Sequence, residues 1–185
     1  MQRRRVCDSV STRHLFVDET KHRDYLLVAA VVVPGNLIAT RRMIRELLLP
    51  GQRRLHMKDE SDPRRRVIAS AVVASGVRAT VYDAGRRYRT ERDRRRACLH
   101  RLVADAVGGN TMLVLEQDDT LLSWDKQCLI EATRDTGQHD SLRYAHRRPT
   151  AEHLLALPDA IAWCWAKGGD WRRRIAPVVT AVCEV

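Results

Sequence analysis

Two apolar runs near the start of the chain are separated by a short polar stretch. The first run ends at Asp18 and Glu19, and the second covers residues 25–33. Runs rich in β-branched and aromatic residues, joined by a few polar ones, predict a β-hairpin over about residues 14–18 and 25–33. The pattern therefore puts two carboxylates at the end of a buried strand, where a rigid sheet can hold a side chain in fixed geometry.

Segments with helical periodicity alternate with short apolar runs after the hairpin. Helical patterns bounded by capping residues, Pro or Gly predict helices, and short apolar or alternating runs predict strands. The predicted helices cover about residues 37–48, 61–75, 91–107, 120–134 and 158–167. The predicted strands cover about 77–82, 111–115 and 142–146, and residues 175–183 could form a last strand or a packed tail. This order predicts an α/β domain whose mixed sheet opens with the hairpin and is flanked by helices.

The length of 185 residues fits one domain with a sizeable core. Residues 1–12 are polar and basic, so we expect a flexible basic tail followed by a single domain over residues 13–185. Five scattered cysteines without a Cys-x-x-Cys pair argue against a zinc ribbon or a disulfide framework. The basic N-terminus lacks the apolar core of a signal peptide, and the longest apolar run is too short to span a bilayer. We therefore expect a cytoplasmic protein with no membrane segment.

The positive charge of the chain is almost entirely arginine. The formal net charge is +10, and only four of the 33 basic residues are lysines. The planar guanidinium binds phosphate oxygens in pairs, so the arginine runs indicate a phosphate-backbone footprint, although an arginine-rich composition on ordinary solvated surfaces explains them equally well. The predicted nucleic-acid contacts are Lys58, Arg94, Arg95, Arg172 and Arg173.

Three carboxylates occupy positions that a fold could bring together. Asp18 ends the first strand, Glu116 ends the strand at 111–115, and Asp159 follows Pro158 in the first turn of the late helix. Hard oxygen ligands of this kind suit Mg²⁺ or Mn²⁺, and two such ions about 4 Å apart can hold the attacking and leaving oxygens of a phosphodiester. The residues predict a three-carboxylate metal site, with Glu19 as a further candidate ligand. Taken singly, each acid is also explained by a turn, a cap or a helix dipole.

Two stretches resemble an uncharacterised family catalogued as domain of unknown function 3800. The stretch Phe-Val-Asp-Glu-Thr at residues 16–20 resembles that family's opening Asp-Glu-Ser-Gly strand, with Thr20-Lys21 in place of Ser-Gly. The segment 154–163 resembles its late helix start, with Leu157-Pro158 in place of Leu-Ala before Asp159. The resemblance implies a ribonuclease H-like fold, similar to the RuvC and retroviral-integrase nucleases.

The resemblance also implies roles for the three acids. Asp18 corresponds to the first-strand acid, Asp159 to the last-helix acid and Glu116 to the mid-sheet acid of a metal-dependent nuclease. We therefore expect hydrolysis of phosphodiester bonds in DNA or RNA with Mg²⁺ or Mn²⁺. Two alternatives stay open. One is a catalytically inactive ribonuclease H-like module that binds nucleic acid or protein, and the other is an assembly role in which the Trp-rich C-terminal region forms a homodimer.

Overall fold

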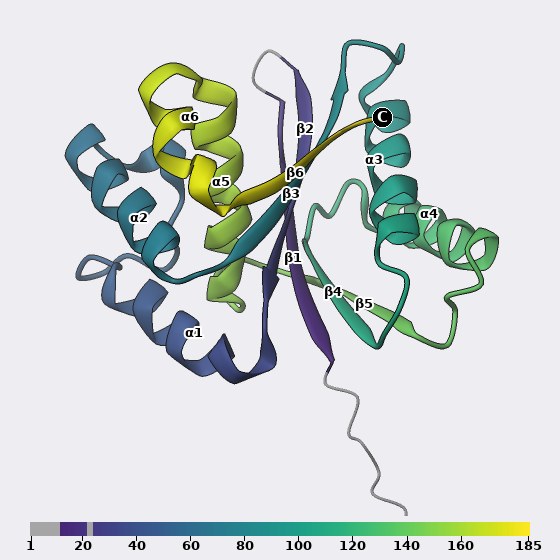
Figure 1. Cartoon of the computed structure of the whole chain (residues 1–185), viewed down its shortest axis with the longest axis horizontal. Coiled ribbons are helices and arrows are strands. Elements are labelled where there is room, and N and C mark those ends of the chain that lie inside the picture. The colour runs from purple at the N-terminus through teal and green to yellow at the C-terminus, as the bar shows by residue number, and fades with distance from the viewer. Residues whose placement is uncertain (1–11, 22–23) are drawn as a thin grey trace, which may run out of the picture.

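A mixed six-stranded sheet separates the helices into two layers (Figure 1). The computed structural model describes residues 12–21 and 24–185, so the predicted basic tail lies almost wholly outside the described residues. The strands are β1 (Arg13–Thr20), β2 (Tyr25–Val32), β3 (Arg78–Gly85), β4 (Thr111–Glu116), β5 (Leu142–Arg147) and β6 (Val179–Glu184). Their order across the sheet is β5-β4-β1-β2-β3-β6. Residues 175–183, for which the sequence allows a last strand or a packed tail, include most of strand β6.

The predicted β1–β2 hairpin is confirmed and occupies the middle of the sheet. β4 lies parallel to β1, β5 parallel to β4, and β6 parallel to β3, whereas β3 pairs antiparallel with β2. Helices cover both faces of the central strands, which is why β2 is an almost unbroken apolar run instead of an alternating one. The sheet is therefore mixed and flanked by helices, as the sequence predicts.

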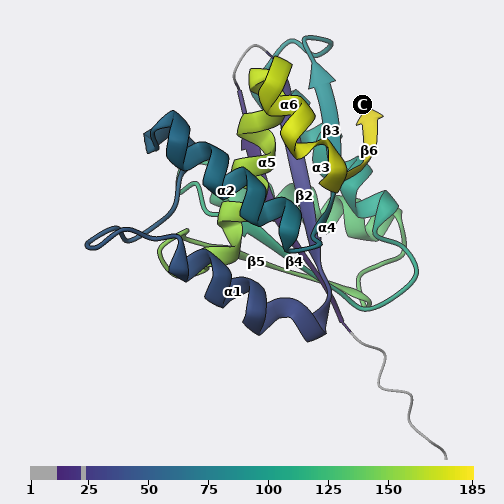
Figure 2. The ribbon, with the colours of Figure 1, turned by 60° about the vertical axis from the view of Figure 1, so that its left-hand side comes forward.

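The helices α1, α2, α5 and α6 cover one face of the sheet, and α3 and α4 cover the other (Figures 1 and 2). Their bounds are α1 (Leu37–Glu46), α2 (Asp62–Ala74), α3 (Glu91–Asp105), α4 (Leu122–Asp135), α5 (Ala156–Lys167) and α6 (Gly169–Ile175). The described residues also form four 3₁₀ turns: η1 (Pro34–Asn36), η2 (Met57–Asp59), η3 (His153–Leu155) and η4 (Ala176–Val178). No helix in the described part of the chain is long and apolar enough to cross a membrane.

The late helix α5 begins two residues earlier than the sequence predicts. Pro158 was expected to open it, but the helix starts at Ala156 and Pro158 is its third residue. The first four N–H groups of a helix have no partner within it, so a proline at this position loses no hydrogen bond. The shift moves Asp159 from the helix start to the fourth helical position.

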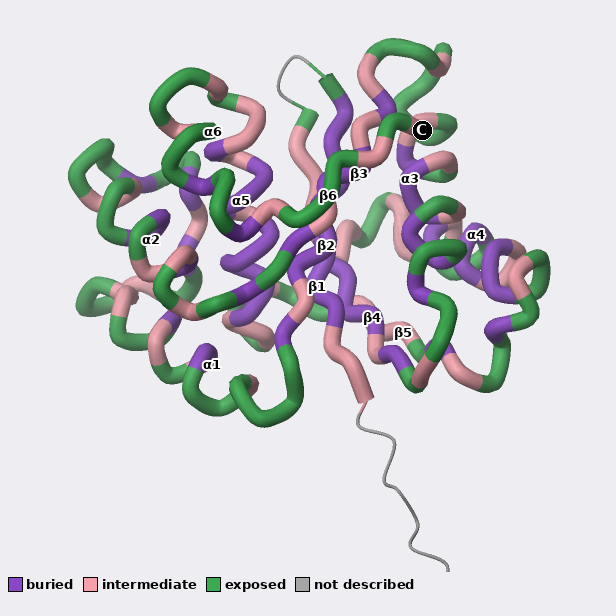
Figure 3. The backbone as a smooth tube through the Cα atoms, viewed as in Figure 1, coloured by how far each residue is buried: buried purple, intermediate pink, exposed green. Residues whose placement is uncertain are grey.

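Two apolar cores lie on the two faces of the sheet, and the buried segments follow the sheet in Figure 3. Because strand side chains alternate between faces, Phe16 and Val114 pack beneath α5, whereas Val17 and Leu115 pack beneath α3 and α4. Each strand of the β1–β4 pair therefore contributes to both cores. The alternation also decides on which face the following residues lie.

A capping box at the start of α3 gives a test of the local structure. The Thr90 hydroxyl accepts a hydrogen bond from the Asp93 N–H (3.1 Å), and the Asp93 carboxylate accepts one from the Thr90 N–H (3.3 Å). Removing such a cap costs about 1 kcal/mol, so Thr90→Ala should lower the free energy of unfolding by about that amount. Ser61, the N-cap of α2, makes no side-chain capping bond, so Ser61→Ala is the matched control and should change little. Urea denaturation measures both, and equal effects would contradict the assignment.

Candidate active site

Asp18 and Glu116 stand side by side on neighbouring parallel strands. The pairing of β1 with β4 ends at Val17 and Leu115, and the two acids are the next residues on each strand. Since Val17 and Leu115 point into the core beneath α3 and α4, the two acids turn to the opposite face, which α5 covers. Asp18 and Glu116 therefore occupy adjacent strands and the same face of the sheet. β1 itself continues along β2 for two residues beyond Asp18, so this acid does not end its strand.

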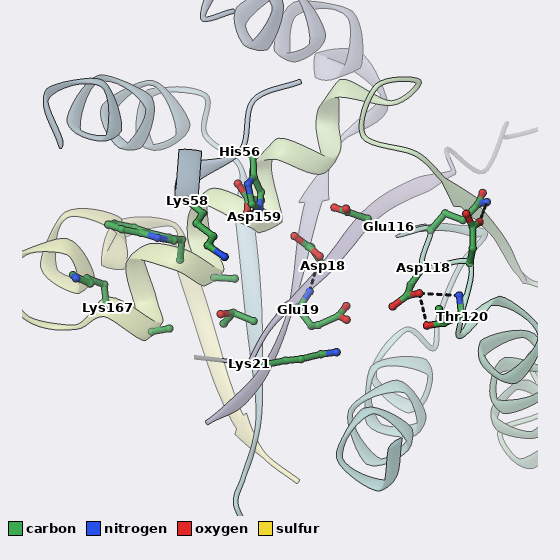
Figure 4. A pocket seen from close by; sticks show the side chains of 16 residues that line it. Asp18, Glu19, Lys21, His56, Lys58, Glu116, Asp118, Thr120, Asp159 and Lys167 are labelled. Carbon is green, nitrogen blue, oxygen red and sulfur yellow. Dashed lines mark hydrogen bonds and ion pairs between the residues drawn. The ribbon is translucent and has the colours of Figure 1, made fainter. Parts of the chain in front are cut away.

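Asp159 comes to the same place from α5. A cleft of about 780 Å³ lies near the carboxyl ends of β1 and β4, and it is lined by Asp18, Glu116 and Asp159 (Figure 4). The other lining residues are Glu19, Thr20, Lys21, His56, Lys58, Gln117, Asp118, Asp119, Thr120, Ala162, Trp163, Ala166 and Lys167. The structure therefore brings all three sequence-predicted acids into one cleft, although they are separated by up to 141 residues of chain.

The carboxyl groups of all three acids have raised pKa values, and burial is the largest cause for each. Burial is the largest cause for Asp18, whose pKa lies well above its usual range, and the charges of Glu116, Glu19 and Asp159 raise it further. Burial and then the charge of Asp159 raise the pKa of Glu116. Burial also raises the pKa of Asp159, although the charge of His56 opposes this. Like charges close together in a poorly hydrated site disfavour simultaneous ionisation of the carboxyl groups.

Asp159 also joins the turn η2 to α5. Its Oδ2 accepts a hydrogen bond from the Met57 N–H (2.8 Å), and its Oδ1 lies 3.6 Å from His56 Nε2. The other ring nitrogen of His56, Nδ1, lies 3.0 Å from the Asp59 carboxylate. Asp159 therefore has structural partners in addition to its position in the cleft.

The carboxylate oxygens of the cleft are suitable ligands for Mg²⁺ or Mn²⁺, but the described side chains do not form a preassembled metal site. Asp18, Glu116 and Asp159 offer the hard oxygen atoms that these ions prefer. No group of three or more His, Cys, Asp or Glu side chains within the described ranges is arranged to hold a metal ion.

Glu19 also lines the cleft, but its carboxylate is directed toward the network beneath α3 and α4, as alternation along a strand requires. Its carboxylate lies 2.6 Å from Arg95 Nη1, and Arg95 also donates two hydrogen bonds to Asp125 (2.6 and 2.7 Å) and one to the Tyr25 hydroxyl. The Arg95 side chain is 3% exposed and that of Asp125 0%. The prediction that Arg95 contacts nucleic acid is therefore wrong, because a buried guanidinium with these partners cannot reach a phosphate. The carboxylate of Glu19 is already paired with Arg95, which argues against metal binding, and Glu19 stays a candidate ligand.

The other predicted nucleic-acid contacts are differently placed. Lys58 lines the cleft. Arg94 lies on α3, across the sheet from α5, and donates to the Tyr88 carbonyl. Arg172 on α6 lies over the Trp165 ring, and Arg173 pairs with Asp170 (3.4 Å). These four stay predictions.

Comparison with known proteins identifies the fold but not a family. No protein-family model matches the chain, and no curated protein matches it. A solved structure of the PCNA:RNase HII complex from Archaeoglobus fulgidus contains a chain that is similar to 85% of this one, covering 73% of its own length, at 16% identity and a TM-score of 0.54.

The fold is ribonuclease H-like. The mixed sheet with its antiparallel β1–β2 hairpin agrees with this assignment. The narrower resemblance to domain of unknown function 3800 is not confirmed, since no family model matches.

The positions of the few lysines in the sequence coincide with the cleft, which our interpretation of the sequence did not predict. Three of the four lysines, Lys21, Lys58 and Lys167, line the cleft of this ribonuclease H-like fold, and no arginine among the described residues does. An arginine fork clamps a carboxylate with two hydrogen bonds, whereas an ammonium on a flexible stem is a compact point charge. Lysine at these positions leaves the carboxylates available. Lys21 itself pairs with Glu91 (3.1 Å), away from the three acids.

Neutralising Asp18 should stabilise the fold at neutral and alkaline pH. A raised pKa means that the folded state binds a proton that the unfolded state releases, so the cost of ionising Asp18 appears as the pH rises above the ordinary value of 3.8. Asp18→Asn removes this cost and keeps an oxygen for the Glu19 N–H, which bonds Asp18 at 2.8 Å. In EDTA, the variant should melt above the wild type at about pH 8 and equally with it at about pH 3.

Asp118 provides a control of opposite sign for this experiment. Hydrogen bonds from Thr120 lower the pKa of Asp118, so its ionised form stabilises the folded state and this contribution is lost as the pH falls. Asp118→Asn should therefore melt below the wild type at about pH 8, with the difference closing at low pH. If both variants shift in the same direction, the assignment of the Asp18 pKa fails.

The buried pair of Arg95 and Asp125 should be essential for stability. Arg95→Met leaves the Asp125 carboxylate buried without its cation, and breaking such a pair costs about 3–5 kcal/mol. The matched control is the next residue, because Arg96 forms an exposed pair with Glu131 and Arg96→Met should have little effect. Urea denaturation of both variants checks this, and comparable losses would show that burial of the pair is unimportant.

Proposed function

We propose that this chain is a metal-dependent nuclease that hydrolyses phosphodiester bonds of nucleic acid in the cleft. The observation that carries the proposal is the meeting of Asp18, Glu116 and Asp159, from three separate elements, in one cleft where burial and neighbouring carboxylates raise the pKa values of Asp18 and Glu116. Divalent cations relieve repulsion of this kind. Asp18, Glu116 and Asp159 would hold Mg²⁺ or Mn²⁺.

Nucleic acid is the substrate class that the fold and the charge support. The similar solved structure contains an RNase HII, and the present chain shares its ribonuclease H-like fold. The net charge of +10 attracts polyanions. The two motifs that resemble domain of unknown function 3800 supply Asp18 and Asp159, and both line the cleft, which supports our inference that the chain is a divergent relative of that family.

The chemistry divides between the ion and the protein. A bound Mg²⁺ or Mn²⁺ would supply Lewis-acid activation of the phosphodiester and of a water molecule. The carboxylates of the chain would balance the charge of the ion and fix its position, and the ammonium groups of Lys58 and Lys167 would contact phosphate oxygens that the ion leaves free. Because the carboxylates must lose protons to bind the ion, the apparent metal affinity should rise with pH through their raised pKa values.

A ribonuclease H-like binding module without catalysis is the second candidate. One observation favours it: Asp159 already accepts the Met57 N–H and faces His56, so its carboxylate is explained by anchoring η2 to α5. In that case nucleic acid would bind without metal-dependent cleavage.

Glu116→Gln gives the cleanest test of the metal site. No hydrogen bond or ion pair of the Glu116 side chain to another described residue was found, so its neutralisation should leave the fold intact. In the wild type, Mn²⁺ should raise the melting temperature and activate cleavage of a labelled oligonucleotide. Glu116→Gln and Asp159→Asn should lose both responses, whereas Asp119→Asn, which removes a cleft carboxylate that pairs with Arg148, should keep both.

The outcome separates the two candidates. Wild-type protein that binds nucleic acid but shows neither Mn²⁺-induced stabilisation nor cleavage is the binding module. If Asp159→Asn keeps both responses while Glu116→Gln loses them, Asp159 is a structural anchor and the three-carboxylate site is wrong.

A further inference from the structure

We propose that a single-stranded stretch of nucleic acid leaves the cleft across α5, α6 and α2 along a phosphate track formed by Lys58, Lys167 and Arg66, with Trp163 and Trp171 beneath it. The proposal rests on nucleic acid being the substrate, and it adds the path of the strand. The three helices contact one another on one face of the sheet, and Figure 2 shows α2 and α6 in front of α5.

Trp163 connects the cleft to this outer face. Its side chain lines the cleft, and its ring packs edge-to-face against Trp171, with centroids 5.2 Å apart and an interplanar angle of 81°. The Lys167 ammonium lies 5.9 Å from the Trp163 centroid and also lines the cleft. The aromatic pair therefore makes a continuous surface from the carboxylates to α6.

Arg66 extends that surface onto α2. Its guanidinium carbon lies 5.8 Å from the Trp171 centroid, and the residue is exposed. A guanidinium in cation–π contact with an indole face spends none of its N–H donors on the ring, so the donors stay available to phosphate oxygens. Among the described residues, no carboxylate lies within ion-pair distance of Arg66, Lys58 or Lys167.

Arg65 lies on the same surface, but its hydrogen-bond donors are already bound within the protein. The guanidinium carbon of Arg65 lies 4.6 Å from the centroid of the Trp163 ring. Its N–H groups donate to the Met57 carbonyl (2.8 Å), the Lys58 carbonyl (2.9 Å) and the Asp62 carboxylate (2.7 Å). Arg65 is therefore excluded from the track and has a positioning role. It holds η2 on one side while Asp159 holds it on the other, and the Lys58 ammonium projects into the cleft (Figure 4).

Charge complementarity selects a phosphate backbone as the occupant. Six carboxylates line the cleft, so a polyanion can enter only where cations offset them. Lys58, Lys167 and Arg66 supply unpaired positive charge along one side. Cations interleaved with aromatic rings are typical of surfaces that bind single strands, because exposed bases stack where a duplex would keep them inside.

The experiment measures binding of a labelled oligothymidylate by fluorescence anisotropy, without divalent ions, over a series of salt concentrations. Each phosphate contact on a single strand contributes about 0.7 to the slope of log K against log salt. Arg66→Ala and Lys167→Ala should each reduce the slope by about 0.7, which corresponds to about fivefold weaker binding at about 0.1 M salt. The control is Arg134→Ala, an exposed arginine on α4 at the opposite face, which should keep the wild-type slope.

Tryptophan emission provides a second readout. Binding should change the intrinsic fluorescence of the wild type, and Trp163→Phe should lose most of that change. The track is overturned if the wild type does not bind the single strand at low salt, or if the Arg66 and Lys167 variants weaken binding no more than Arg134→Ala. Unchanged melting temperatures for the three alanine variants confirm that each is folded.

Failure of the track and failure of the nuclease are distinguishable, because the binding assay contains no metal. If the wild type cleaves with Mn²⁺ but the Arg66 and Lys167 variants bind normally, the proposed track is wrong and the proposed nuclease activity is supported. Binding that depends on Arg66 and Lys167 without any cleavage keeps the track and removes the nuclease.

Discussion

The alternation of side chains along β1 is the constraint on which the site depends. Asp18 and Glu19 are neighbours in sequence, but the pleat sends them to opposite faces of the sheet. Asp18 meets Glu116 and Asp159 beneath α5, whereas Glu19 meets Arg95 and the network beneath α3 and α4. One strand thereby contributes Asp18 to the cleft on one face of the sheet and Glu19 to a buried ion-pair network on the other.

The two faces treat negative charge in opposite ways. Beneath α3 and α4, Arg95 satisfies Asp125 and Glu19, and His146 lies 3.4 Å from Asp125, so hydrogen bonds keep the pKa of Asp125 low despite its burial. In the cleft no guanidinium is present among the described lining residues, and the pKa values of the acids rise. The acids beneath α3 and α4 therefore share a buried guanidinium, whereas the acids of the cleft have raised pKa values and no guanidinium among the described lining residues.

Much of this arrangement was predictable because it is local. Apolar periodicity identified the hairpin, the strand before Glu116 and the helix that carries Asp159, whereas Glu19 stayed a candidate ligand although neighbouring side chains on a strand alternate between faces. The position of Arg95 was not predictable in this way. Residues 94–96 are three consecutive arginines, and which of them turns inward depends on the rotation of α3 against the sheet and on an aspartate in a different helix. Pairing of η2 with Asp159 likewise joins segments about a hundred residues apart, so no local pattern signals it.

The chemistry of the basic residues also changes what a solvent-borne reagent would encounter. Guanidinium groups are inert to acylating agents at neutral pH because they stay protonated, whereas a lysine amine reacts through its neutral form. In most proteins such reagents modify the surface indiscriminately. Here three of the four lysine side chains line the cleft, and the fourth, Lys126, is exposed on α4, so acylation of lysine amines would fall mainly on one cleft.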